Sequence, residues 1–294
     1  MFRRFVGFRS YGRSVWTVNW RNQRSGHGSL RPDRIVNAYQ KGQTIEITIT
    51  NFFVDPQNII EDRLVLTAEE AKHLHQVLRA KAGDTFYAID GSGLKYRTVI
   101  ETISDSSVKG FITTVTRLDN EPFYHITLAQ GICRHTKMDE IVERGTEIGV
   151  SSFIFYFSEK GYSKMQEESS SAKRVSRLNR IAKAAAKLSK RSLIPSIGEL
   201  FTFREILGLR SQFDLSMVAV FDSSAKSVES YLDNKSSIKK ILLMVGPESG
   251  FSKDEETACL KSGFLPVSLG PRRLRTETAG IIFPALVLSH LGDI

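Results

Sequence analysis

Apolar and polar residues alternate along residues 84–115, and this period of two predicts strands of a sheet with one covered face. The predicted strands are 84–90, 95–103 and 108–115. Gly91-Ser92-Gly93 supplies a hairpin turn after the first of them. Upstream, Thr67 and Glu70 have the spacing of a capping box, and apolar residues then recur at helical spacing. We therefore expect a small β-barrel with one helix at residues 51–118.

The hydrophobic period changes beyond this barrel, and residues 119–294 are predicted to form a second domain. The predicted strands are 125–133, 152–157, 215–222 and 242–245, and the predicted helices begin near residues 136, 172, 252 and 276. The first strand, helix and strand follow the order of a βαβ unit, and unbroken apolar strands are typical of a sheet covered on both faces. The last helix, 276–291, is apolar on nearly all sides, so we expect it to be buried all round and kinked at Pro284.

The helix predicted at residues 172–191 combines an apolar stripe with a strongly cationic face. Its basic residues, with no acidic residue among them, are Lys173, Arg174, Arg177, Arg180, Lys183, Lys187, Lys190 and Arg191. Such a face suits phosphate groups, so binding to a polyanion is the favoured interpretation. A solvated charged surface and a membrane surface are the alternatives, although the apolar side lacks bulky aromatic anchors.

Two loops in the last third of the chain have the same construction. The first, Gly246–Ser252, follows an apolar strand and precedes a helix start at which Ser252 and Glu255 have capping-box spacing. The second runs from Leu269 to Ala279 and also places a Gly-Pro turn and several charges before a helix start. Strand, loop and helix in this order place the loop against a ligand, so we expect the two loops to share one site. The alternative is a pair of surface turns with solvated charges.

These loop sequences resemble the two C-terminal signatures of the small-subunit (16S) ribosomal RNA uracil-N3 methyltransferases. That family is a branch of the trefoil-knotted, S-adenosylmethionine-dependent SPOUT RNA methyltransferases. The opening of the second domain is similar to the family's catalytic domain in Lys137-Met138-Asp139, Ile141-Val142, Thr146–Val150 and Ser158-Glu159-Lys160. His73, Val77-Leu78-Arg79, Lys81 and Gly83-Asp84 resemble its N-terminal RNA-binding domain.

The resemblance implies an α/β fold in which a PUA-like β-barrel precedes a trefoil-knotted, parallel-sheet methyltransferase domain. It also implies a homodimer with the cofactor pocket beside the dimer contact. The implied cofactor-binding residues are Val245, Gly246, Pro247, Glu248, Gly250, Leu269, Gly270, Arg272, Leu274, Arg275 and Thr276. The RNA-binding candidates, from the barrel and from the basic helix, are His73, Arg79, Lys81, Arg174, Arg177, Arg180, Lys187 and Arg191.

The implied reaction transfers a methyl group from S-adenosylmethionine to N3 of a specific uridine in small-subunit ribosomal RNA. Methylation at N3 removes an imide proton and requires stabilisation of charge on the flanking carbonyl oxygens. Arg275 or Arg191 is expected to supply that stabilisation, and Glu248 or Glu277 to act as a base or positioning group. Both carboxylates also have structural interpretations, since Glu277 suits the first turn of a helix and Glu248 can brace its loop.

The match departs from the family at several positions. Arg144 stands where Lys is usual and Lys160 where Arg is usual. Ala184, Lys187 and Leu188 stand where members commonly carry two glutamates and a glutamine. A catalytically weak or inactive RNA-binding protein of the same fold therefore stays open, as does a knotted methyltransferase that acts on a ribose 2′-hydroxyl or another base.

Composition adds limits to this interpretation. Residues 1–50 hold nine Lys or Arg and two acidic residues, a net charge of +7, so of the total +9 the other 244 residues carry only +2. This basic extension resembles an organelle transit peptide, a disordered RNA-binding arm or a mis-assigned start, so the expected location is the cytoplasm or, with a transit peptide, an organelle. No apolar stretch approaches the ~18 residues of a membrane span, and neither the two cysteines nor the six histidines have metal-ligand spacing. The expected partner is small-subunit ribosomal RNA or the assembled subunit, with no metal and no membrane.

Overall fold

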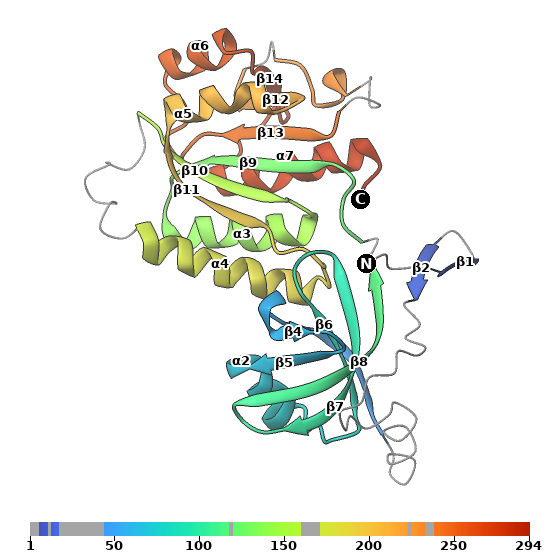
Figure 1. Ribbon diagram of the computed structural model, residues 1–294. Coiled ribbons are helices and arrows are strands. Elements are labelled where there is room, and N and C mark those ends of the chain that lie inside the picture. The colour runs from blue at the N-terminus through green and yellow to red at the C-terminus, as the bar shows by residue number, and fades with distance from the viewer. Residues whose placement is uncertain are drawn as a thin grey trace. The chain divides into compact units, whose positions relative to one another are not determined.

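A computed structural model of the chain divides into two compact units, Met1–Glu121 and Pro122–Ile294 (Figure 1). The structure describes residues 6–10, 13–17, 44–117, 120–159, 171–222, 225–232 and 238–294. Each unit has its own hydrophobic core and is described by itself.

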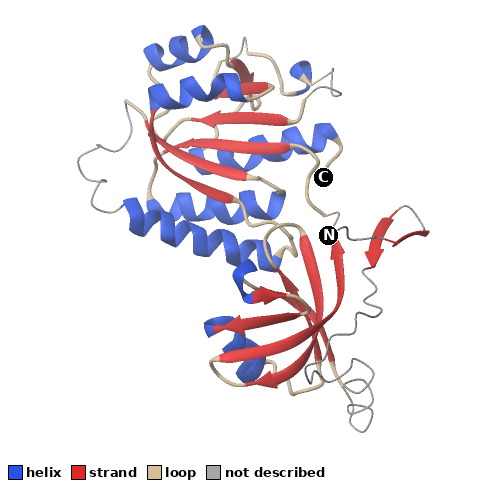
Figure 2. Cartoon of the chain, in the orientation of Figure 1, coloured by secondary structure: helices blue, strands red, loops and turns tan. Residues whose placement is uncertain are grey.

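The first unit is built on a curled sheet of six strands (Figures 1 and 2). Its strands are β3 (Glu46–Phe53), β4 (Ile59–Ile60), β5 (Arg63–Thr67), β6 (Thr85–Ile89), β7 (Leu94–Ile103) and β8 (Ser107–Arg117). They lie in the order β3-β6-β7-β8-β5-β4, and every pair is antiparallel except β3 with β6. Phe52 and Phe86 are fully buried and meet edge to face, with ring centroids 5.7 Å apart.

One helical segment packs on this sheet. It starts as α2 (Ala68–Lys72) and continues as a π-helical turn, η2 (His73–Val77), which buries Leu74 completely. Thr67 is the residue before α2, but its side chain accepts no capping hydrogen bond, so the predicted capping box is wrong. The helix is held instead by the burial of Ala71 and Leu74 against the sheet.

The predicted boundary at residue 50 is wrong because β3 begins at Glu46 and pairs with β6. Ile47 is buried in the core of the unit, so the alternating Glu-Ile-Thr-Ile-Thr run is a strand rather than part of an extension. Further upstream, β1 (Val6–Ser10) and β2 (Arg13–Thr17) form an antiparallel pair. Residues 1–5, 11–12 and 18–43 of the predicted basic extension lie outside the described residues.

The second unit is a six-stranded, entirely parallel sheet with helices on both faces (Figure 2). Its strands are β9 (His125–Gly131), β10 (Ser152–Phe157), β11 (Ser196–Thr202), β12 (Leu215–Val220), β13 (Lys240–Val245) and β14 (Leu265–Ser268), in the order β11-β10-β9-β13-β12-β14. Its helices are α3 (His135–Ile148), α4 (Ser171–Leu188), α5 (Phe203–Gly208), α6 (Lys253–Lys261) and α7 (Thr276–Leu291), with short 3-10 turns η5 (Leu209–Gln212) and η6 (Glu229–Tyr231).

The two faces of this sheet bury alternate residues of the same strands. Leu128 and Leu243 belong to the cluster that contains residues of α3, α4 and α7, whereas Ala129, Leu242 and Met244 belong to the cluster that contains residues of α5 and α6. Both faces of the sheet are therefore covered by helices and shielded from water, which is why these strands are unbroken apolar runs in the sequence. The predicted parallel α/β architecture is confirmed, while the trefoil knot stays a prediction from the resemblance.

Two helix predictions need correction. The helix α3 begins at His135 with Arg134 as its N-cap and has no side-chain cap, so Thr136 lies inside its first turn. The helix α7 has the predicted bounds, but it is not buried on every side in this chain, because Ile282 and Leu286 are 38% and 42% exposed.

Candidate functional site

The loops after β13 and β14 line one cavity of about 340 Å³ at the carboxyl edge of the parallel sheet. Its lining residues are Ala219, Val220, Phe221, Val245–Phe251, Glu256, Leu269, Gly270, Arg272, Arg273, Leu274, Thr276 and Ala279. Strands β13 and β14 both pair with β12, so parallel pairing brings their carboxyl ends to the same edge. The expectation that Gly246 and Gly270 share a site is confirmed in this respect.

The first loop is fixed at both ends. Gly250 has φ +73° and donates its N–H to the carbonyl of Pro247 at 3.0 Å, which closes a tight turn that favours glycine. Ser252 Oγ accepts from Glu255 N at 3.1 Å, and Ser252 N donates to Glu255 Oε2 at 2.9 Å, so the predicted capping box is present. Glu255 also accepts from Ser158 Oγ at 2.8 Å, which ties the loop to the end of β10.

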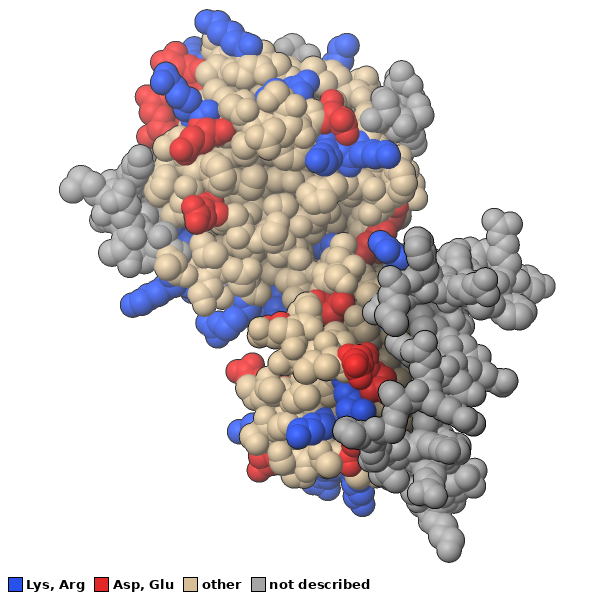
Figure 3. Space-filling view, viewed as in Figure 1, with Lys and Arg blue, Asp and Glu red and all other residues tan. Residues whose placement is uncertain are grey.

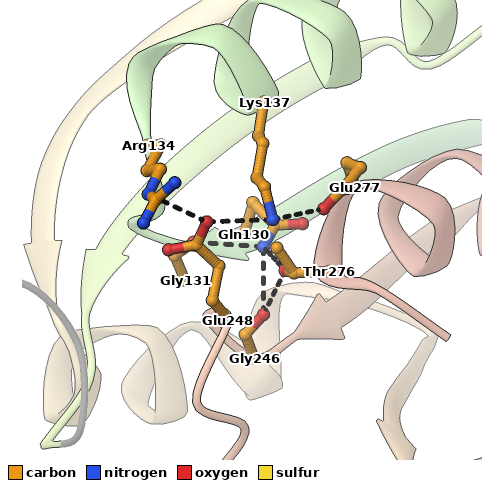
Figure 4. Close-up of polar contacts among 8 residues, drawn as sticks. All are labelled: Gln130, Gly131, Arg134, Lys137, Gly246, Glu248, Thr276 and Glu277. Atoms are coloured by element: carbon orange, nitrogen blue, oxygen red, sulfur yellow. Dashed lines mark hydrogen bonds and ion pairs between the residues drawn. The ribbon is translucent and has the colours of Figure 1, made fainter. Parts of the chain in front are cut away.

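The end of β9 presses against the same loop (Figure 4). A Cβ on Gly131 would lie 2.6 Å from Pro247 N and 2.9 Å from Gly246 C, so only glycine permits this approach. The fully buried Gln130 places Nε2 3.1 Å from Gly246 O and 2.8 Å from Thr276 Oγ1. Thr276 Oγ1 in turn donates to Gly246 O at 2.6 Å. These contacts join β9, the first loop and the start of α7.

One ammonium group bridges the carboxylates of both loops (Figure 4). Lys137 Nζ lies 2.9 Å from Glu248 Oε1 and 3.0 Å from Glu277 Oε2, and Arg134 Nε lies 4.0 Å from the same Glu248 oxygen. The contact with Glu277 is an ion pair, since no donor points at that oxygen with hydrogen-bond geometry. Lys137 stands in the first turn of α3, where the helix dipole disfavours a cation, so the two carboxylates compensate a local conflict.

The ion pairs change the acidity of these groups. The contacts with Glu248 and then with Glu277 raise the pKa of Lys137 above its ordinary value. Burial by itself raises the pKa of Glu277, but its backbone hydrogen bond and Lys137 outweigh burial and leave that pKa below its ordinary value. Burial, with a smaller contribution from the charge of Glu248, raises the pKa of Cys133 to about 12, so this thiol stays protonated at neutral pH.

The predicted catalytic residues do not all lie together. Glu277 is in the first turn of α7, and Arg275 is the exposed N-cap residue of that helix. Arg275 is close enough to contribute to the lowered pKa of Glu277. Arg191 does not line the cavity, and its guanidinium Nη1 donates to Thr146 O at 2.9 Å and to Val150 O at 2.8 Å.

Arg191 was expected to face RNA or the reacting groups, but it is 4% exposed and holds the carboxyl end of α3. Arg174, another RNA-binding candidate, is also buried and is 7% exposed in this chain. The helix α4, which contains Arg174, has an exposed cationic side that includes Arg180 and Lys183. On the same helix, Arg177 pairs with Asp139 of α3. Lys187, another RNA-binding candidate, is half-buried.

The candidates of the first unit cluster around the π-helical turn. His73 begins this turn and packs on Phe52 with ring centroids 5.7 Å apart. Arg79 is exposed and has φ +55°, and Lys81 is exposed while its backbone N–H donates to Asp84 Oδ2 at 2.8 Å. A π-helical turn frequently marks a functional site, and here His73 begins the turn while Arg79 and Lys81 follow it.

Sequence reasoning missed three contributors to the cavity region. Gln130 and Arg134 were given no role, and Lys137 was noted only as part of a resemblance. A polar residue that ends an apolar strand just before a glycine, as Gln130 does, was the available signal. Among the described residues, no group of three or more His, Cys, Asp or Glu side chains is arranged to hold a metal ion, and no described helix is long and apolar enough to span a membrane.

Comparison with known proteins gives consistent results. The model of the RNA methyltransferase domain matches residues 119–288, and that of the RNA methyltransferase PUA domain matches residues 66–113. The chain is 28% identical over 218 residues to ribosomal RNA small subunit methyltransferase E of Bacillus subtilis, covering 73% of this chain and 85% of that protein. It is 31% identical over 165 residues to the protein of the same name from Aquifex aeolicus, covering 56% of this chain and 68% of that protein.

Solved structures resemble the chain over most of its length. The structure of ribosomal RNA small subunit methyltransferase E from Neisseria gonorrhoeae bound to S-adenosyl methionine has a TM-score of 0.71 at 26% identity, covering 82% of this chain and 97% of that one. A methyltransferase from Legionella pneumophila in complex with the same cofactor has a TM-score of 0.72 at 25% identity, covering 84% of this chain and 98% of that one.

Proposed function

The chain belongs to the RNA methyltransferase family, whose domain model matches more than half of it, and from this premise we propose that it methylates N3 of a uridine in small-subunit ribosomal RNA with S-adenosylmethionine as the donor. The observation that carries the proposal is the single cavity shared by the loops after β13 and β14. The names of the relatives from Bacillus subtilis and Aquifex aeolicus support the substrate class.

The cavity suits a nucleoside cofactor. Its volume of about 340 Å³ is at the lower end of the ~300–1,000 Å³ that small-molecule sites occupy. Apolar side chains of Val245, Leu269 and Leu274 line it beside exposed loop backbone, and Gly250 and Gly270 have open space where a Cβ would stand. When bound, S-adenosylmethionine supplies a methyl group on a sulfonium centre, which is activated for transfer to a nucleophile.

The residues around the cavity have distinct tasks in this proposal. The pKa of Glu277 lies below its ordinary value because its backbone hydrogen bond and Lys137 outweigh burial, so Glu277 contributes as a fixed negative charge and positioning group rather than as a strong base. Arg275, exposed beside Glu277, is placed to stabilise negative charge on a uracil carbonyl oxygen. Gln130 and Gly131 keep the first loop in register with α7, which fixes the lining on which orientation depends.

RNA contacts in the proposal come from both units. In the first unit, Arg79 and Lys81 are exposed next to the π-helical turn. In the second unit, Arg180 and Lys183 are exposed on α4. On the face drawn in Figure 3, Lys and Arg form several separate groups rather than one continuous patch, so RNA binding depends on local clusters.

The proposal includes a homodimer and a cytoplasmic location, with an organelle as the alternative if the N-terminal basic segment is a transit peptide. The exposed apolar residues Ile282 and Leu286 on α7 support a subunit contact, because this strongly apolar helix leaves them open to solvent in one chain. Sedimentation of the purified chain tests this part of the proposal.

A second candidate function is RNA binding without turnover. It is favoured by Leu188, which is 75% exposed at a position where the family resemblance leads us to expect a polar residue. Transfer of tritiated methyl groups to small-subunit ribosomal RNA or assembled subunits from a strain lacking the modification, followed by nucleoside analysis, separates the possibilities. N3-methyluridine supports the proposal, label on a ribose hydroxyl selects another methyltransferase activity, and RNA binding with no incorporation at saturating cofactor selects the binding protein.

A further inference from the structure

The cavity is small relative to an RNA substrate, so most contacts with RNA must lie outside it. A volume of about 340 Å³ accommodates one ligand of cofactor size, as judged from the ~300–1,000 Å³ of small-molecule sites. Nucleotides that flank the reacting base therefore meet the residues at the rim of the cavity. Those rim residues are the ones that both line the cavity and are exposed to solvent.

The exposed residues of the lining are Phe221, Glu248, Ser249, Gly270, Arg272 and Arg273. Phe221 is 66% exposed, directly after β12. A large aromatic ring in this position gains little from the core, since most of its surface stays in water. Its place at the mouth of a cavity therefore points to a ligand that covers the ring.

The charges at the rim select the kind of ligand. Arg272 and Arg273 enter no ion pair with any other residue that the structure describes. Glu248 is paired with Lys137, so the carboxylate at the rim is already neutralised, and the other carboxylate of the lining is that of Glu256. An exposed aromatic ring with two guanidinium groups on the loop after the neighbouring strand is the chemistry that binds single-stranded RNA, in which bases stack on rings and phosphates pair with arginine.

We propose that Phe221 and Arg273 form an RNA-binding rim at the mouth of the cavity, where the Phe221 ring stacks on a base of the single-stranded RNA substrate and Arg273 contacts an adjacent phosphate. This inference rests on the proposed function for the identity of the RNA. It deepens that function by assigning substrate affinity to residues that the cofactor does not need. The cofactor's own base is the competing occupant of the Phe221 ring, and the test separates the two.

The test uses the full chain and compares Phe221→Ala, Phe221→Trp and Arg273→Ala with wild type. Phe123→Ala is the matched control, because Phe123 is an equally open phenylalanine of the second unit, 70% exposed, that does not line the cavity. Measured quantities are the KM for unmodified small-subunit ribosomal RNA, kcat, and the Kd of S-adenosylhomocysteine by calorimetry. Binding of a single-stranded oligonucleotide to each variant by fluorescence anisotropy gives a readout that does not depend on turnover.

Phe221→Ala is expected to raise the KM for RNA and the oligonucleotide Kd about tenfold, the loss of one stacked base. The Kd of S-adenosylhomocysteine is expected to stay within about twofold, and Phe221→Trp restores RNA binding because any flat ring stacks. Arg273→Ala is expected to reduce the slope of log affinity against log salt by about 0.7, the loss of one phosphate contact to a single strand. Phe123→Ala leaves every quantity unchanged.

Other outcomes overturn the proposal. If Phe221→Ala weakens S-adenosylhomocysteine and leaves RNA binding intact, the ring belongs to the cofactor site. If Phe221→Ala and Phe123→Ala have equal effects on RNA, the rim has no special role. Failure of the proposed function is distinguishable, because a wild-type chain that transfers no methyl group to ribosomal RNA still reports in the oligonucleotide measurement whether Phe221 contacts RNA.

Discussion

The side-chain amide of Gln130, at the end of β9, lies 2.8 Å from the hydroxyl of Thr276, the first residue of α7, although 146 positions separate them in the chain. Both groups also meet the carbonyl of Gly246, so one buried cluster fixes the first cavity loop to a strand and a helix. The Oε1 atom of Gln130 is buried and has no hydrogen-bond partner among the described residues. The amide of Gln130 therefore stabilises this cluster through its Nε2 donor and not through its oxygen.

Gln130→Leu removes the donor and the unsatisfied oxygen together, whereas Gln130→Glu removes the donor and adds a charge that cannot be solvated. We expect Gln130→Leu to lower the free energy of unfolding by about 1–3 kcal/mol and Gln130→Glu to lower it further. Urea unfolding measures both, with the exposed Gln212→Leu as a control. Equal stability of the Leu and Glu variants would contradict the assigned role of the amide.

Gly131→Ala tests the contact between β9 and the first loop. An added Cβ would meet Pro247 N at 2.6 Å, and backbone atoms cannot rotate away as a flexible side chain can. We expect a loss of about 1–3 kcal/mol in the free energy of unfolding and weaker binding of S-adenosylhomocysteine. Gly208→Ala is the control, because nothing lies within 4 Å of the Cβ position in that α-helical residue, and alanine there is expected to be neutral or stabilising. Wild-type stability and wild-type S-adenosylhomocysteine binding in Gly131→Ala would contradict this prediction and show that the loop can move aside.

Lys137→Met removes the ammonium shared by Glu248 and Glu277. The pKa of Glu277 is lowered in the folded chain, so its stabilising contribution is present above its unfolded-state pKa and is lost as pH falls through the folded-state pKa. Without Lys137, one of the groups that lower the pKa of Glu277 is missing, so burial raises this pKa. The stabilising contribution of Glu277 is then lost at a higher pH. At neutral pH we expect a cost of roughly 1–3 kcal/mol.

Urea unfolding and S-adenosylhomocysteine binding between pH 7 and pH 3 check this prediction. In Lys137→Met, the fall of the free energy of unfolding at acidic pH is expected to begin at a higher pH than in wild type. Arg144→Met removes an exposed ion pair with Glu147 from the same helix and is the matched control. Lys137→Arg keeps the charge and is expected to restore most of the wild-type profile. A Lys137→Met profile that runs parallel to wild type would contradict the electrostatic role.

Arg191→Met tests the corrected role of a predicted catalytic residue. The guanidinium satisfies the carbonyls of Thr146 and Val150 in a buried position, so its loss is expected to cost about 2–4 kcal/mol. Activity per folded molecule is expected to stay near wild type, and Lys261→Met, an exposed lysine of α6, is the control. A lower kcat with an unchanged free energy of unfolding would contradict this structural role and support the catalytic role that was first predicted for Arg191.

Arg275→Ala tests the remaining guanidinium candidate. Removal of a group that stabilises developing negative charge is expected to lower kcat by about 10²-fold. The Kd of S-adenosylhomocysteine should change far less, because the guanidinium is exposed at the N-cap of α7 and its side chain does not line the cavity. Single-turnover methyl transfer measures the step directly, and unchanged turnover removes Arg275 from the site. Arg204→Ala, an exposed arginine of α5, is the control.

The sequence by itself determined most of the strands and helices in the second unit, both cavity loops, the Ser252–Glu255 cap and the family, but it missed β11, β14 and α5. These features depend on neighbouring residues, because hydrophobic periodicity, Gly-Pro turns and capping pairs act within one or two turns of chain. It failed at β3, where an alternating strand directly follows a segment that is rich in basic residues and glycine.

Only the tertiary structure decided which charged groups meet. The pairing of β9 with β13 brings Gln130 against Gly246 and Lys137 between Glu248 and Glu277, and no local pattern encodes contacts between such distant segments. The same holds for Arg191, which belongs to a basic run in the sequence but is buried against α3. Burial and partners of a charge depend on how the sheet and helices pack, whereas the residue type fixes only that a charge is present.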